Sequence, residues 1–279
     1  NDLLLGDGAT TVHDAEMGWS APIEVFPTHE LIPPGDDTLI GGAGRDELIG
    51  GGGKDNLDGG ADGGRVAAGV GEGVLTGGGG HDLLTADQFD VNDFGNDVID
   101  GGDGVDRASF YNLFGGVTVD LTLEGVAQDT GTTGIDTLTS IEHVTATYFS
   151  DTLIGNEADN WFWSMGGNDV LVGNGGDDLF TASWGDHSFD GGTGSDTVEI
   201  YDDSYAQIYG EGGITLSLEF QGQAQATEVG NWTLSGIENL LGSWAGDRLT
   251  GDNGDNILGG ADGDDVLVGG GGNDRLFGD

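Results

Sequence analysis

Within several stretches of this chain, aspartate recurs at intervals of nine residues or a multiple of nine, in most cases at the end of a glycine-rich segment. These positions are Asp37, Asp46, Asp55, Asp82, Asp97, Asp106, Asp151, Asp169, Asp178, Asp196, Asp247, Asp265 and Asp274, and asparagine holds the same place at Asn160 and Asn256. Their side-chain oxygens are hard ligands, and a site that offers six or more oxygens in a flexible geometry suits calcium better than magnesium. Because no thiols or imidazoles cluster nearby, we expect these residues to bind calcium rather than zinc.

Aspartates two repeats apart are expected to share an ion, with glycine carbonyls supplying the remaining ligands. The best pairs by this rule are Asp37 with Asp55, Asp151 with Asp169, Asp178 with Asp196, and Asp247 with Asp265. Asn160 facing Asp178, and Asn256 facing Asp274, keep an oxygen but lose a charge. Gly64, Gly73 and His187 replace the aspartate, so we expect vacant or weakened sites around 59–76 and beside His187. Counting the pairs predicts on the order of ten calcium ions.

The aspartates belong to a nine-residue repeat, G-G-x-G-x-D-x-U-x, in which U is a large apolar residue. Units follow one another in frame over 32–85, over 146–199 and from 242 onward, and a shorter piece fills 92–109 after a six-residue slip. The expected domains are a partial repeat with an irregular insertion (1–34), a first array with a degenerate middle (35–109), a spacer (110–145), a second array (146–199), a second spacer (200–241) and a third array that stops in mid-repeat (242–279).

Each repeat predicts one turn and one short strand. The glycine-rich half must visit positive φ, and the x-U-x half is long enough for a strand of about three residues. Two repeats return the chain to its starting side, so coils of eighteen residues should stack at roughly 4.8 Å into a parallel β-roll. The U residues should line its interior: Leu39, Leu48, Leu57, Val66, Leu75, Leu84, Leu153, Phe162, Leu171, Phe180, Phe189, Val198, Leu249, Leu258, Leu267 and Leu276.

This repeat resembles the calcium-binding nonapeptide of the RTX (repeats-in-toxin, hemolysin-type) family, and the resemblance covers a little over half of the chain. It implies a β-roll that folds around calcium. It also implies export of the unfolded chain by type I secretion from a bacterium, with folding where calcium is millimolar. The expected location is therefore extracellular or at the cell surface.

Composition agrees with a cation as the main partner. The formal charge is −45, from 51 acidic and 6 basic side chains, so the chain repels nucleic acid and anionic membrane surfaces. There is no cysteine for a disulfide, and no apolar run is long enough to span a membrane. Such composition also occurs in disordered chains and in the solvated surfaces of salt-adapted proteins, but the fixed position of aspartate argues against both.

Two segments interrupt the repeat and resemble each other: GGVTVDLTLEG at 115–125 and GGITLSLEFQG at 212–222. Their alternating apolar residues predict antiparallel strands, as in a hairpin that covers a roll or joins two rolls. The expected fold is therefore all-β, with a parallel β-roll (β-solenoid) in three arrays that are interrupted by antiparallel β-hairpin spacers.

The sequence carries no catalytic motif. His29-Glu30 begins like H-E-x-x-H, but Pro33 stands where the second histidine would be. We therefore predict a non-catalytic structural segment of a surface, adhesin or fibre-forming protein, with head-to-tail self-association between roll ends. Two alternatives remain: the secretion and folding region of an enzyme whose catalytic domain lies elsewhere, and a glycan-binding module. The glycan hypothesis rests on Trp161 and Trp163, on either side of Phe162, and on Trp184 and Trp244 in turns.

Overall fold

The computed structural model describes residues 3–5, 11–13, 35–87, 95–111, 113–131, 134–201 and 213–278. The chain divides into two compact units. Unit 1 comprises residues up to Ser109 with Glu124–Asp129 and Thr133–Ile141, and unit 2 comprises Phe110–Leu123, Thr130–Thr132 and Glu142–Asp279. Of the predicted insertion at 1–34, only the short strands at 3–5 and 11–13 are described, so His29 and Pro33 lie outside the described residues.

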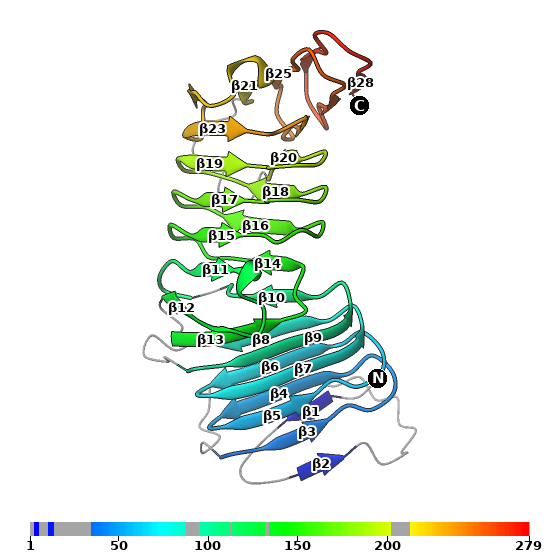
Figure 1. The fold of residues 1–279 in the computed structure, drawn as a ribbon, viewed down its shortest axis with the longest axis vertical. Helices are drawn as coiled ribbons and strands as arrows, with labels where there is room; N and C mark the ends of the chain where they lie inside the picture. The colour runs from blue at the N-terminus through cyan, green and yellow to red at the C-terminus, as the bar shows by residue number, and fades with distance from the viewer. Residues whose placement is uncertain are drawn as a thin grey trace. The chain divides into compact units, whose positions relative to one another are not determined.

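Unit 1 is built from two sheets in which neighbouring strands such as β4 and β6, or β7 and β9, pair in parallel (Figure 1). Sheet 1a has the order β1-β4-β6-β8-β10, and sheet 1b has the order β12-β13-β9-β7-β5-β3-β2. The strands are β1 (Leu3–Leu5), β2 (Thr11–His13), β3 (Thr38–Ile40), β4 (Glu47–Gly52), β5 (Asp55–Asp58), β6 (Arg65–Val70), β7 (Gly73–Gly80), β8 (Leu83–Asp87), β9 (Val98–Gly104), β10 (Arg107–Ser109), β12 (Ala127–Gly131) and β13 (Gly134–Thr139).

Unit 2 has a sheet 2a of order β14-β16-β18-β20-β24-β26-β28, a sheet 2b of order β11-β15-β17-β19-β23-β22 and a sheet 2c of order β21-β25-β27. Its elements are β11 (Thr118–Asp120), η1 (Leu121–Leu123), β14 (His143–Thr145), β15 (Thr152–Ile154), β16 (Trp161–Met165), β17 (Val170–Val172), β18 (Leu179–Ala182), β19 (His187–Asp190), β20 (Thr197–Ile200), β21 (Thr215–Ser217), η2 (Leu218–Phe220), β22 (Ala224–Ala226), β23 (Asn231–Ser235), β24 (Asn239–Leu241), β25 (Arg248–Thr250), β26 (Ile257–Gly259), β27 (Val266–Val268) and β28 (Arg275–Phe277).

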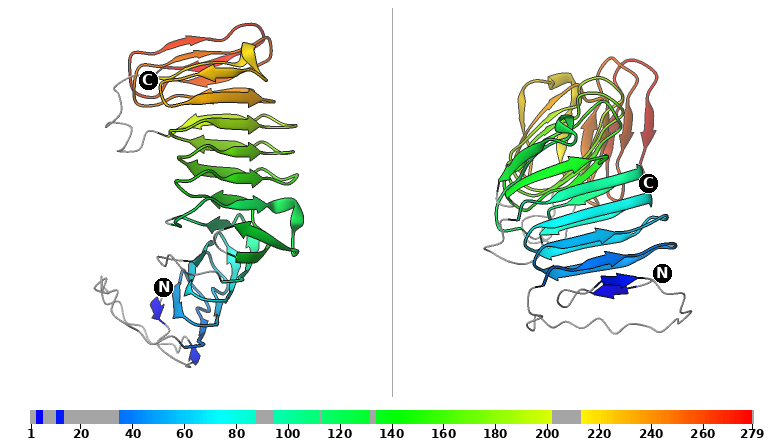
Figure 2. Two further views of the ribbon diagram at one scale, coloured as in Figure 1. Left: turned by 90° about the vertical axis from the view of Figure 1, so that its left-hand side faces the viewer. Right: turned by 60° about the horizontal axis from the view of Figure 1, so that its bottom comes forward.

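Within an array, consecutive strands alternate between two sheets, so each strand pairs with the strand two places along the chain. Leu153 pairs with Leu171, and Leu171 pairs with Phe189, in parallel register. Figure 2 shows the resulting coils of unit 2 stacked one on the next. The described residues form strands and two short 3₁₀ turns, and contain no helix long and apolar enough to cross a membrane. The parallel β-roll predicted from the repeat is confirmed.

The U residues fill the narrow interior as predicted. Leu39, Leu48, Leu57, Val66, Leu75, Leu84, Leu153, Phe162, Leu171, Phe180, Phe189, Val198, Leu249 and Leu258 are all at most 1% exposed. In unit 2 the rings of Phe162, Phe180 and Phe189 follow one another at 6.0 and 5.9 Å between centroids. In the last coils that the structure describes, Leu267 is half-buried and Leu276 is 46% exposed.

The prediction that VTVDL and ITLSL form antiparallel strands was wrong. β11 pairs in parallel with β15, where Val119 faces Leu153, and β21 pairs in parallel with β25, where Leu216 faces Leu249. Each segment places one apolar residue in the interior just as an x-U-x strand does, and alternation of apolar residues alone cannot distinguish parallel from antiparallel pairing. Antiparallel pairing does occur nearby, between β22 and β23.

Candidate metal centres

The position-six residues stand immediately before strands or within their first three residues, so each sheet carries a column of them along one edge. In unit 1, the column before sheet 1a is Asp46, Gly64, Asp82 and Asp106, and the column before sheet 1b is Asp37, Asp55, Gly73, Asp97 and Asp136. In unit 2, the column before sheet 2a, here called the 2a edge, is Glu142, Asn160, Asp178, Asp196, Glu238, Asn256 and Asp274. The column before sheet 2b, here called the 2b edge, is Val117, Asp151, Asp169, His187 and Trp232, and the column before sheet 2c is Ile214, Asp247 and Asp265.

Hydrogen bonds run along these columns from one coil to the next. Asp178 N–H donates to Oδ1 of Asp196 at 2.8 Å, and Asp37 N–H donates to Oδ1 of Asp55 at 2.9 Å. The other two predicted pairs have the same bond: Asp151 to Asp169 at 2.9 Å and Asp247 to Asp265 at 2.8 Å. The structure therefore brings together all four pairs that the repeat spacing favours. In each pair, the main-chain N–H of the first aspartate satisfies one carboxylate oxygen of the second.

Most of the position-six carboxylates are withdrawn from water. Asp37, Asp46, Asp55, Asp82, Asp97, Asp106, Asp151, Asp169, Asp178, Asp196 and Asp247 are at most 3% exposed, whereas Asp265 and Asp274 are half-buried. Burial raises the pKa of Asp178 to about 7, with the charges of Asp196, Asp159 and Asp177 adding to the effect. Desolvation also raises the pKa of Asp82, Asp106 and Asp196. Such columns hold like charges in a weakly screening environment, which is unfavourable without a cation.

Some of these carboxylates have an oxygen that no protein group satisfies. The Oδ2 atoms of Asp82, Asp178 and Asp196 are buried and have no hydrogen-bond donor among the described residues. A buried acceptor without a donor typically costs about 1–3 kcal/mol, and more when it is charged. These atoms are therefore where a bound cation would contribute most.

Position one of the repeat is glycine because its surroundings leave no room for a side chain. A Cβ on Gly173 would lie 2.7 Å from the carbonyl oxygen of Gly191 and would collide with Oδ2 of Asp178. In unit 1, a Cβ on Gly77 would lie 2.5 Å from the carbonyl oxygen of Gly101 and 2.8 Å from Oδ2 of Asp82. A carboxylate oxygen and a main-chain carbonyl thus approach the same α-carbon, which leaves a small space walled by oxygen.

The donor set fits calcium. Among the residues that the structure describes, no group of three or more His, Cys, Asp or Glu side chains could hold a metal. An ion must therefore take main-chain carbonyls in addition to one or two carboxylates. Calcium accepts six to eight such oxygens at 2.3–2.6 Å in flexible geometry, unlike zinc. Asp178 and Asp196 on the 2a edge, and Asp82 in unit 1, would hold it best.

The two asparagines are arranged differently. Oδ1 of Asn160 accepts from Asn156 N–H at 2.9 Å, while its Nδ2 donates to the carbonyl of Glu142 at 3.0 Å. Asn256 repeats this with Asp252 N–H at 2.8 Å and the carbonyl of Glu238 at 2.9 Å. Both amides therefore already have partners on each side, and Asn160 and Asn256 stay predicted ligands whose atoms are used within the protein.

The glycine replacements keep the main-chain ladder without a carboxylate of their own. Gly64 N–H donates to Oδ1 of Asp82 at 2.5 Å, and Gly73 N–H donates to Oδ1 of Asp97 at 2.6 Å. The coils therefore stack past these positions, although each column loses a charge there. This geometry agrees with weaker ion binding around 59–76, which remains a prediction.

Three acidic residues in these columns, Asp136, Glu142 and Glu238, were missed by the sequence reasoning. Asp136 is fully buried, and its Oδ1 accepts from Asp97 N–H at 2.9 Å. Its segment, GTTGIDTLT at 131–139, fits the repeat and pairs in parallel with β9, so the pattern was present inside the expected spacer. Glu238 takes the place of aspartate after Asp196, whose N–H donates to Oε2 of Glu238 at 2.9 Å. No glycine turn marks Glu238 in the sequence.

The tryptophans divide into two groups. Trp161 and Trp163 are half-buried on the outer face of sheet 2a, with nearly parallel rings 6.3 Å apart, and Nε1 of Trp161 donates to Thr181 at 2.8 Å. Trp184 and Trp244 lie in turns and are 41% and 66% exposed. The first pair is therefore partly committed to contacts within the protein, and the second pair faces solvent.

Parallel coils whose turns bury aspartate against main-chain carbonyls define a metal-dependent β-roll. The model of one family, the RTX calcium-binding nonapeptide repeat, matches residues 34–66, 93–108, 145–180, 163–198 and 241–279, which together make up more than half of the chain. The chain belongs to this family, whose repeats bind calcium. A comparison with curated protein sequences finds no match.

Proposed function

We propose that this chain is an extracellular, calcium-dependent structural segment of a bacterial surface, adhesin or fibre-forming protein, with no catalytic activity of its own. The observation that carries the proposal is the set of buried, donorless Oδ2 atoms of Asp82, Asp178 and Asp196. Bound calcium supplies positive charge and is coordinated by these oxygens. The carboxylate columns then become cross-links between coils rather than a source of repulsion.

The net charge and the thin apolar interior support a fold that forms only when calcium binds. The chain carries 51 acidic and 6 basic side chains, and its interior receives mainly one apolar side chain per nine residues. Ordering the backbone costs about 1–2 kcal/mol per residue, which so thin an interior does not offset. Because the ligand set is completed only when coils stack, the free energy of ion binding is also free energy of folding.

The proposed location follows from that coupling. Calcium modules of extracellular proteins are tuned to about 10⁻⁴–10⁻³ M, far above cytosolic calcium. A chain of this kind stays open inside the cell, passes a type I secretion channel unfolded and folds outside. On the order of ten ions would offset a large part of the formal charge of −45.

A calcium titration tests the proposal. The protein, purified in the presence of a calcium chelator, is titrated with calcium. Circular dichroism reports β-structure and light scattering reports particle size during the titration. We expect cooperative folding between about 0.1 and several millimolar calcium, with magnesium unable to substitute. Growth of large particles alongside would support a fibre or lattice. Equal β-structure in chelator and in calcium would overturn the proposal.

One observation favours a second role, glycan binding by the exposed rings of Trp184 and Trp244. Aromatic faces that are open to solvent can stack on sugar rings. A polysaccharide pull-down in calcium, compared between the natural chain and Trp244→Ala, decides for or against it. Equal retention of both proteins would exclude Trp244 from any such site.

A further inference from the structure

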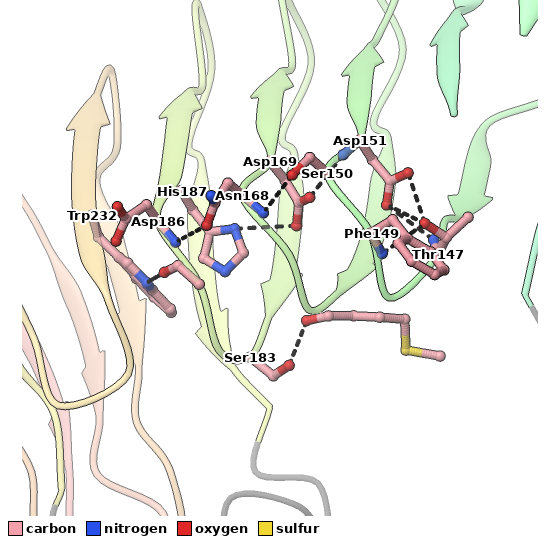
Figure 3. A network of polar contacts seen from close by, with 12 residues as sticks. Thr147, Phe149, Ser150, Asp151, Asn168, Asp169, Ser183, Asp186, His187 and Trp232 are labelled. Carbon is pink, nitrogen blue, oxygen red and sulfur yellow. Dashed lines mark hydrogen bonds and ion pairs between the residues drawn. The ribbon is translucent and has the colours of Figure 1, made fainter. Parts of the chain in front are cut away.

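The two edges of the array at 146–199 differ in chemistry, although both are built from the same nine-residue repeat. On the 2a edge, Oδ2 of Asp178 and of Asp196 is buried without a donor. On the 2b edge, protein groups donate hydrogen bonds to both oxygens of Asp151 and to several turn carbonyls, and the His187 ring lies against Asp169 (Figure 3). The difference bears directly on where calcium binds.

Asp151 begins the run of acidic residues on the 2b edge, and both of its oxygens are satisfied. Oδ1 accepts from Val117 N–H at 2.7 Å and from the Thr147 hydroxyl at 2.9 Å. Oδ2 accepts from Thr147 N–H at 3.0 Å. Thr147 stands at position two of its repeat, where the repeat pattern has glycine, and is itself fully buried. Its hydroxyl and N–H therefore do for this carboxylate what an ion would do elsewhere.

Asp169 follows in the column and faces a histidine rather than an aspartate. Its Oδ1 accepts from Asp151 N–H at 2.9 Å, and its Oδ2 lies 3.1 Å from Nδ1 of His187. Both side chains are completely buried in this contact. The contact does not have hydrogen-bond geometry, so Oδ2 of Asp169 has no donor among the described residues, but the buried imidazole occupies the space beside it. Figure 3 shows the His187 ring placed between Asp169 and Trp232.

The turn carbonyls of the 2b edge are engaged as well. Ser183 donates both its N–H and its hydroxyl to the carbonyl of Met165. Nε1 of Trp232 donates to the carbonyl of Gly185 at 3.1 Å, and the ring of Trp232 packs edge-on against His187 at 5.3 Å. Trp232 is fully buried at position six of the next coil, where it offers no oxygen.

Position one also separates the two edges. The turns of the 2a edge begin with Gly155, Gly173 and Gly191, whose added Cβ atoms would collide with the position-six side chain or a carbonyl of the next coil. The turns of the 2b edge begin with Ala146, Ser164 and Ala182, which carry a Cβ and are fully buried. The 2b edge therefore fills with side-chain atoms the space that the 2a edge leaves beside its carboxylates.

We infer that the 2b edge is closed by the protein itself, through Thr147, Ser183, His187 and Trp232, so that calcium in this array binds along the 2a edge at Asp178 and Asp196. This rests on the proposed role of calcium at the donorless carboxylates. It differs from the expectation, drawn from repeat spacing, that Asp151 and Asp169 share an ion. The array should thus bind fewer ions than its repeats suggest, and one of its edges should hold together without any.

The same substitution on opposite edges tests the inference. Asp178→Asn and Asp169→Asn each remove one buried carboxylate from the same array, and isothermal titration calorimetry counts the calcium bound by each variant. We expect Asp178→Asn to lose at least one ion relative to the natural chain and Asp169→Asn to lose none. Loss of an ion by Asp169→Asn that equals the loss by Asp178→Asn would overturn the inference.

A crystal of the natural chain grown in calcium gives an answer that does not depend on whether a variant folds. Anomalous scattering should show an ion within about 2.3–2.6 Å of Asp178 or Asp196 and none near Asp169 or His187. An ion bound to Asp169 would refute the closed 2b edge while leaving calcium-dependent folding intact. Absence of calcium from both edges would instead refute the proposed function.

Discussion

The main-chain N–H of Asp178 donates to Oδ1 of Asp196 across 2.8 Å, one coil further along the roll. The bond fixes the spacing of two buried carboxylates and satisfies one oxygen of Asp196. The Oδ2 atoms of both residues are left without a donor. Stacking of coils and the demand for a cation therefore arise from the same geometry.

Asp196→Asn should weaken calcium-dependent folding, because it removes a charge from a carboxylate that lacks a donor. We expect a loss of about 2 kcal/mol in the calcium-loaded state, seen as a higher calcium midpoint by circular dichroism. Asp190→Asn is the matched control, since Asp190 is exposed on β19 in the preceding repeat. Equal shifts in the two variants would mean that net charge, rather than the buried site, sets the midpoint.

Gly173→Ala should disrupt the turn before Asp178, because its Cβ would collide with Oδ2 of Asp178 and lie 2.7 Å from the carbonyl oxygen of Gly191. Overpacking of this kind costs about 1–3 kcal/mol. Gly175→Ala serves as control in the same turn: its Cβ would meet the flexible end of Glu157 at 3.0 Å and Thr193 Oγ1 at 3.3 Å. Urea unfolding in saturating calcium should separate the two variants, and equal stabilities would contradict the oxygen-walled space.

The calcium-free chain should respond to acid in the opposite sense to the calcium-loaded chain. Burial raises the pKa of Asp178 from 3.8 to about 7, so between these values the folded state binds more protons than the unfolded state. In chelator, stability contributed by this group is full below about pH 4 and is lost as pH rises through about 7. Calcium requires the carboxylate, so its affinity should fall as pH drops below about 7.

Circular dichroism in chelator at pH 5 and pH 8, and urea unfolding in calcium at the same two pH values, measure both effects. We expect more β-structure at pH 5 than at pH 8 in chelator, and a less stable fold at pH 5 than at pH 8 in calcium. Less β-structure at pH 5 than at pH 8 in chelator would contradict the buried, donorless state of Asp178.

Leu258→Ala should destabilise the loaded roll far more than Leu276→Ala. The two leucines pair in register between β26 and β28, but Leu258 is fully buried whereas Leu276 is 46% exposed. A buried leucine truncated to alanine typically costs about 2–5 kcal/mol, and a half-exposed one costs well under half of that. If urea unfolding gives equal losses, a further layer must cover Leu276 in solution, as head-to-tail association would provide.

Thr147→Val keeps the shape of the side chain but removes the hydroxyl that donates to Asp151. We expect a loss of about 1–2 kcal/mol that is the same in low and high calcium, because the bond lies on the edge that the protein closes itself. Thr152→Val, at a half-buried outward position of β15, should be nearly neutral. A loss that vanishes in saturating calcium would indicate that an ion can replace the hydroxyl.

The repeat alone predicted the roll, its coil length and the buried U residues, since a period of nine leaves few other ways to alternate turn and strand. The four favoured aspartate pairs also lie adjacent, because coil length determines which position-six residues meet. What spacing could not show is how each carboxylate is satisfied. The roles of Thr147 and His187 depend on side-chain direction within a turn. Trp232 reaches position six after a long interruption, and no periodicity carries across it.

The coil between Leu75 and Ile99 is longer than its neighbours, since the bond that links its ends joins residues 24 apart rather than the usual 18. The strands on either side are nevertheless paired in full parallel register. Six additional residues of sequence between two repeats therefore leave the pairing of the flanking strands in register. The roll is thus a scaffold that accepts inserted residues between repeats. New binding loops can be added there, by evolution or by engineering, while the pairing of the stacked strands is kept.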